Sequence, residues 1–121
     1  MQSKKDEMEE VYIINTSSFL PNTAITNDVI EEYMGFINGT VSRTKNLILR
    51  NNKIKERYYA IDKDGNSTHS NAEMVSLAIR KLLENNIDPI ELLACGTSSP
   101  DQLMPSHGVM VHGELPELGS I

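Results

Sequence analysis

The chain has 121 residues, 39% hydrophobic and 23% charged, a composition typical of one small globular domain or of part of a larger one. Its formal net charge of −6 argues against a nucleic-acid binder, and no apolar stretch reaches the roughly 20 residues that a membrane span needs. The charged residues 1–10 lack the apolar core of a secretion signal, and Cys95 is the single cysteine, so no internal disulfide forms. We therefore expect a cytoplasmic protein without nucleic-acid or membrane partners.

The sequence predicts a charged tail at 1–10, followed by one α/β unit over 11–121. The apolar run at 11–14 precedes small polar residues, which predicts a buried strand that leads into a loop. Asn27 is a favourable N-cap for a helix with an apolar stripe, and Gly35 is expected to end that helix.

The middle of the chain predicts a helix, a strand and a turn. The helix is expected to start at Ser42, to carry Leu47 and Ile48 inward, and to end at a pair of asparagines. Residues 54–61 alternate imperfectly and contain two tyrosines, which favours a strand. Residues 62–66 are expected to form a polar turn.

The clearest element is a helix over residues 70–85. Ser70 and Glu73 have the spacing of a capping box, and the wide apolar face that follows them predicts burial against a sheet. Residues 92–97 are then predicted to be a buried strand, so the pattern favours a β-α-β unit with helices packed on a mixed β-sheet. Ser106 is expected to cap a last helix.

The basic residues are concentrated in one segment whose only acidic residue is Glu56. In an acidic chain such a segment is either a solvated face or a surface that binds an anionic partner. Six of the eleven lysines and arginines lie there: Arg43, Lys45, Arg50, Lys53, Lys55 and Arg57.

The turn at 62–66, taken together with Glu73, matches positions 1, 3, 5 and 12 of an EF-hand calcium loop. Two features argue against calcium. Ser67 stands where the loop needs glycine, and the segment that enters the loop is predicted to be a strand. Glu73 is also better explained as the partner of Ser70 in the capping box, so calcium binding is the weaker hypothesis.

The remaining reactive side chains suggest no site. Cys95 lies inside an apolar run, where we expect it to behave as a small hydrophobic residue. The three histidines, His69, His107 and His112, do not have the spacing of a metal-ligand set, and no glycine-rich phosphate motif is present. The sequence therefore predicts no metal, no cofactor and no catalytic residue within the chain.

The segment at 93–106, LACGTSSPDQLMPS, resembles the third N-terminal strand, the following loop and the next helix of the ketoacyl-acyl-carrier-protein synthase III family. Residues 12–21 are similar to the family's opening strand and loop, 25–28 to the start of its first helix, and 51–57 to its R-T-G-I-x-x-R motif. These segments occur in the same order as in the family, and the resemblance covers nearly the whole chain after residue 10. The forms NNKIKERYYAID, THSNAE and MVHGEL most resemble the branch of dialkylresorcinol-forming condensing enzymes.

This resemblance implies the N-terminal half of a thiolase-like fold, incomplete without a C-terminal half or a second chain, in a complete protein that is a homodimer. The family transfers an acyl group and forms a carbon–carbon bond between thioesters in fatty acid, polyketide or dialkylresorcinol-type synthesis. Its catalytic Cys, His and Asn have no match here, and Cys95 does not occupy the nucleophile's place. The chain stops at Ile121 as if in mid-fold, and we expect those three residues beyond it.

The resemblance also implies an acyl-binding loop at Leu103, Met104 and Pro105. Met104 matches the family position whose side chain enters the acyl tunnel of the neighbouring subunit, and the alternative is a methionine that plugs the core. The loop is also a candidate from the sequence, because it follows the carboxyl end of a predicted strand and carries large apolar residues.

One departure from the family concerns the thioester. Asn51, Asn52 and Lys53 replace the Arg-Thr-Gly that helps to bind coenzyme A, so a carrier-protein thioester is the expected substrate. The basic segment then becomes the expected docking surface for an acidic acyl carrier protein. Lys53 in place of glycine requires either a negative φ or backbone strain.

Two other functions stay open at this point. The first is a non-catalytic thiolase-fold partner that docks a carrier protein or shapes a pocket for a catalytic subunit, and the second is the EF-hand-like calcium module. A cysteine among small residues beyond Ile121, with a later His and Asn, would favour the enzyme.

Overall fold

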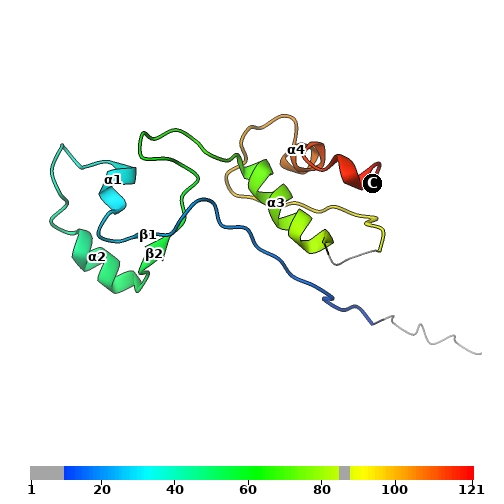
Figure 1. Ribbon diagram of the computed structural model, residues 1–121, viewed down its shortest axis with the longest axis horizontal. Coiled ribbons are helices and arrows are strands. Elements are labelled where there is room, and N and C mark those ends of the chain that lie inside the picture. Colours follow the sequence, from blue (N-terminus) through cyan, green and yellow to red (C-terminus); the bar gives the residue numbers. More distant parts are fainter. Residues whose placement is uncertain (1–9, 85–87) are drawn as a thin grey trace, which may run out of the picture.

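The computed structural model describes residues 10–84 and 88–121, in which the elements form two groups (Figure 1). Helices together with a small sheet agree with the predicted α/β class, and none of the helices in these residues is long and apolar enough to span a membrane. The elements are β1 (Ile25–Thr26), α1 (Ile30–Met34), α2 (Lys45–Asn52), β2 (Glu56–Arg57), α3 (Asn71–Leu83), α4 (His107–Gly113) and the 3-10 helix η1 (Pro116–Leu118).

The first group contains β1, α1, α2 and β2. β1 and β2 pair antiparallel, with Ile25 opposite Arg57. Helix α1 ends at Gly35 as predicted, at a φ of 80° that suits glycine. The predicted cap at Asn27 is wrong, since the N-cap is Val29. The Asn27 side chain instead joins the strands, because its Nδ2 donates to the carbonyl of Ile54 at 2.7 Å and its Oδ1 accepts from Arg57 at 2.8 Å.

Helix α2 differs from its prediction in its start and in its orientation. It begins at Lys45, after Thr44, and ends at Asn52. Leu47 and Ile48 do not face inward, because they are 54% and 58% exposed. The physical reason is that a polar contact between Lys45 and Glu31 ties the start of α2 to the short α1, while the described residues leave Leu47 and Ile48 mostly uncovered.

Two predicted strands are not formed in the part of the chain that the structure describes. Residues 11–14 and 92–97 are outside any sheet, and Val11 and Leu92 are highly exposed. The predicted strand at 54–61 shortens to the two residues of β2. A strand requires a hydrogen-bonded neighbour. The described segments provide only the β1–β2 pair and two isolated bridges, Ile37–Thr40 and Ile61–Ser67, so the predicted β-α-β unit and mixed sheet are absent from these residues.

The second group is built on α3, where the predicted capping box is confirmed. The backbone N–H of Glu73 donates to Ser70 Oγ at 3.0 Å, and the backbone N–H of Ser70 donates to Glu73 Oε2 at 2.6 Å. Helix α3 packs on α4 through a core of fully buried Ala72, Val111 and Leu115. The predicted end of this helix at Asn85-Asn86 lies outside the described residues.

Helix α4 follows Ser106 as predicted, but the Ser106 side chain makes no capping hydrogen bond. The turn at 62–66 is confirmed, since the Asp62 carboxylate accepts from the backbone N–H groups of Asp64 and Asn66, each at 2.9 Å. The Asn66 side chain, with those N–H groups, lowers the pKa of Asp62.

Candidate functional site

The candidate acyl-binding loop, residues 98–106, is held against the start of α3. The Asp101 carboxylate accepts hydrogen bonds from the backbone N–H of Asn71 at 2.7 Å and of Ala72 at 3.0 Å. The Asn71 side chain donates to the carbonyl of Ser99 at 2.6 Å. The first N–H groups of a helix have no partner within the helix, so Asp101 satisfies two of them while its negative charge meets the positive end of the dipole.

These hydrogen bonds have an electrostatic consequence for Asp101. The N–H of Asn71, and after it that of Ala72, lowers the pKa of this carboxyl below its usual value, and the neighbouring His107 acts in the same direction. The charged form of Asp101 is therefore the form that holds the loop. Sequence reasoning did not single out Asp101, because its partners lie about thirty residues earlier in the chain.

The tip of the same loop is apolar and uncovered. Leu103 is 87% exposed and Met104 is 81% exposed, and Pro105 after them is also exposed. Large apolar side chains presented in this way are typical of a surface that packs against another molecule or another part of the same protein. The three residues expected at an acyl pocket are thus brought together on one loop, held at its base by Asp101.

The basic segment divides into two kinds of side chain. Lys45 Nζ binds Glu31 Oε2 at 2.7 Å with both side chains mostly buried, and this contact lowers the pKa of Glu31. Arg57 donates to Asn27 Oδ1, so it also serves the fold. The other four cations, Arg43, Arg50, Lys53 and Lys55, are exposed.

Lys53 stands where the family has glycine, and the sequence predicts either a negative φ or backbone strain there. The structure shows the strained alternative. Lys53 follows α2 at a φ of 58°, in the left-handed region. A residue with a Cβ there costs roughly 1–2 kcal/mol relative to a right-handed conformation, a cost that glycine avoids.

Cys95 is half-buried and packs against the α3–α4 core, as the apolar run around it predicts. Burial raises the pKa of its thiol, so the neutral form is favoured and nucleophilic reactivity is reduced.

The three histidines lie in separate local environments. His112 Nε2 lies 2.7 Å from the carbonyl of Gly119, and His69 packs on the Phe19 ring. His107 is buried at the start of α4, and its Nδ1 has no hydrogen-bond partner among the described residues. Within residues 10–84 and 88–121, no three His, Cys, Asp or Glu side chains cluster as a metal site.

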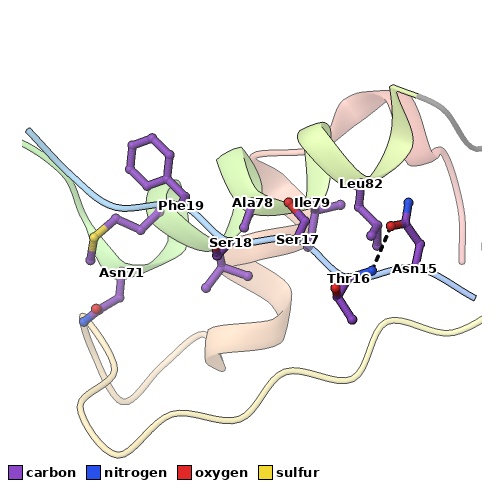
Figure 2. Close-up of a pocket in the computed structure, with 11 residues that line it drawn as sticks. Asn15, Thr16, Ser17, Ser18, Phe19, Asn71, Ala78, Ile79 and Leu82 are labelled. Carbon is purple, nitrogen blue, oxygen red and sulfur yellow. Dashed lines mark hydrogen bonds between the residues drawn. The ribbon is translucent and has the colours of Figure 1, made fainter. Parts of the chain in front are cut away.

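A groove of about 680 Å³ runs between α3 and the extended segment 15–19 (Figure 2). One wall is the apolar side of α3, which includes Ala78, Ile79 and Leu82, and the other wall is the polar run 15–18 together with Phe19. This wall of α3 is part of the wide apolar face that the sequence predicts to pack against a sheet.

Comparison with known proteins gives a distant relationship. No family model matches the chain. It is 29% identical over 116 residues to a protein of Clostridium botulinum and 28% identical over 107 residues to one of Xanthomonas oryzae, which cover 94% and 88% of the chain. A protein of Xanthomonas axonopodis is also 28% identical over 107 residues. All three are named beta-ketoacyl-[acyl-carrier-protein] synthase III, and the chain spans only about a third of their length, 30–32%.

Proposed function

We propose that the full-length protein containing these residues is a condensing enzyme like the beta-ketoacyl-[acyl-carrier-protein] synthases III. It would transfer an acyl group and form a carbon–carbon bond between thioesters, in fatty acid, polyketide or dialkylresorcinol-type synthesis. The observation that carries this proposal is the similarity to three proteins of that name over 88–94% of the chain. The forms NNKIKERYYAID and MVHGEL support the dialkylresorcinol-forming branch.

In this proposal the chain is the N-terminal half of a thiolase-like fold. The segments 11–14 and 92–97, which lie outside any sheet in the described residues, are strands that gain their neighbours from the remaining half or from a second chain. The catalytic Cys, His and Asn lie in that remaining part, and the complete protein is a cytoplasmic homodimer.

Two surfaces of the chain have a role in the proposed reaction. The loop with Leu103, Met104 and Pro105 lies at the dimer interface and lines the acyl pocket, which accounts for the apolar tip that nothing covers among the described residues. The exposed cations of the basic segment bind an acidic acyl carrier protein, while Lys45 and Arg57 keep that surface in shape through Glu31 and Asn27.

The test is a condensation assay on the full-length protein with two acyl donors, one carried by coenzyme A and one by a carrier protein. The acceptor is a malonyl-carrier thioester, and mass spectrometry of the carrier measures the product. We expect a β-ketoacyl-carrier thioester two carbons longer than the donor acyl group, with release of carbon dioxide, and faster turnover with the carrier-bound donor. No product from either donor, with the carrier still bound, would favour the non-catalytic partner.

A further inference from the structure

A second groove, of about 290 Å³, lies between α1 and α2, away from the loop at 98–106. Its base is polar, and the polar groups there bind one another. Glu31 of α1 accepts from the backbone N–H of Ser42 at 2.8 Å and from Lys45 Nζ at 2.7 Å. These two contacts fix the start of α2 relative to α1, and they pair the charges inside the groove.

The walls of this groove are apolar and open to solvent. Met34 from α1, Ile37 from the connection and Ile48 from α2 line it, and more than half of the surface of each side chain is exposed. Its volume is near the lower end of the roughly 300–1,000 Å³ of small-molecule pockets, so it suits one or two inserted apolar side chains better than a whole ligand.

The surroundings of the groove are positively charged. Arg43 follows Ser42 and Arg50 follows Leu49, and both of these neighbours line the groove. Lys53 and Lys55 lie just beyond the end of α2. All four cations are exposed, and none of them forms a salt bridge in the described part of the chain. An apolar groove flanked by positive charges complements a helix on which acidic residues surround an apolar side chain.

We propose that the groove between α1 and α2 receives an apolar side chain of an acidic helix of the acyl carrier protein, while the flanking cations bind that helix's carboxylates. This inference rests on the proposed function and deepens it, because it adds a hydrophobic contact to a docking surface so far described only by charge. It also gives a reason for the outward orientation of Ile48.

The experiment measures the affinity of the full-length protein for a holo acyl carrier protein by calorimetry, with Ile48→Gln as the test and Leu47→Gln as the matched control. The two residues are neighbours on α2 and are exposed to 58% and 54%, but only Ile48 lines the groove. We expect Ile48→Gln to raise the Kd at least tenfold and Leu47→Gln to change it less than twofold. Ile37→Gln tests the opposite wall and should act like Ile48→Gln.

The outcomes separate this inference from the function on which it rests. Equal effects of Ile48→Gln and Leu47→Gln, with loss of binding in Arg50→Gln, would overturn the groove and leave the carrier partner standing. No carrier binding to the unmodified protein would overturn both. Binding to phosphatidylglycerol vesicles that is lost in Ile48→Gln, with carrier affinity unchanged, would assign the groove to a membrane surface and overturn the proposal.

Discussion

The carboxylate of Asp101 accepts a hydrogen bond of 2.7 Å from the backbone N–H of Asn71, thirty residues earlier in the chain. Its second oxygen accepts from the N–H of Ala72 at 3.0 Å, so one side chain satisfies two N–H groups in the first turn of α3 and fixes the base of a loop. The tip of that loop carries Leu103 and Met104, which are the residues proposed to contact the acyl chain. The geometry of the proposed acyl pocket therefore depends on a carboxylate that does not line it.

Replacement of Asp101 by alanine should destabilise the protein by about 1 kcal/mol, the usual effect of losing a side chain that caps a helix. The physical reason is that two backbone N–H groups of α3 lose their acceptor. Thermal unfolding of the full-length protein measures the change. Asp64→Ala, at an exposed aspartate of the 62–66 turn, serves as the control and should change stability by less than half as much. Equal effects of the two substitutions would contradict a capping role.

The pH dependence of stability should also report on Asp101. Its folded-state pKa is lowered, above all by the N–H of Asn71, whereas an unfolded aspartate has a pKa of about 3.9. The unfolded chain therefore binds this proton more readily, so the stabilisation is present above about pH 4 and is lost as the pH falls further. We expect Asp101→Asn to show a shallower fall in Tm below about pH 4 than the unmodified protein. The same slope in both proteins would show that this carboxylate does not contribute.

The capping box at the start of α3 gives a test of the calcium hypothesis. Ser70→Ala should cost about 1 kcal/mol, because the backbone N–H of Glu73 loses its acceptor, and the cost should be the same with and without calcium. Differential scanning calorimetry in calcium and in a chelator measures both values. A calcium-dependent rise in Tm that disappears in Glu73→Gln would instead support the EF-hand-like site.

The sequence predicted the elements that are specified locally. The start of α3 follows from Ser70 and Glu73, which are three residues apart and satisfy each other's backbone, and the end of α1 follows from a glycine at positive φ. The turn at 62–66 has the same local character, since the Asp62 carboxylate binds backbone groups two and four residues away.

The predictions that failed depend on distant partners. Residues 11–14 and 92–97 have strand-like sequences, but a strand forms only beside a neighbour, which no described segment supplies. Ile48 has the spacing of a buried residue, yet the contact that orients α2 is the Glu31–Lys45 ion pair. Asp101 gave no local signal beyond an aspartate after a proline, because its role depends on where α3 begins.

Residues 1–121 expressed alone should lack a cooperative unfolding transition. Apolar side chains such as Val11, Ile13 and Leu92 are highly exposed. In the described residues the buried hydrophobic core is limited to Ile25, Ala72, Val111 and Leu115. Calorimetry combined with analytical ultracentrifugation measures the transition and the association state. A sharp transition from a monomer would contradict the prediction that this segment needs further protein to cover it.

Met104→Trp in the full-length protein should shorten the acyl chain that the proposed enzyme accepts. The Met104 side chain is 81% exposed in this chain, so a larger residue meets no clash within the described residues and folding should be unaffected. At the proposed dimer interface, the indole would fill space that flexible methionine leaves for longer or more varied chains. Competition among acyl-carrier donors of different length, followed by mass spectrometry, measures the preference.

The matched control for that variant is Val41→Trp. It places the same side chain at an exposed apolar position in the segment that connects α1 to α2. It should leave the chain-length profile unchanged, because residue 41 lies outside the loop at 98–106. Leu103→Ala removes a neighbouring apolar contact without filling the pocket, so it should not shift the preference toward shorter chains. A profile that is unchanged in Met104→Trp, with Tm and activity retained, would leave Met104 a structural residue and would remove the loop from the acyl pocket.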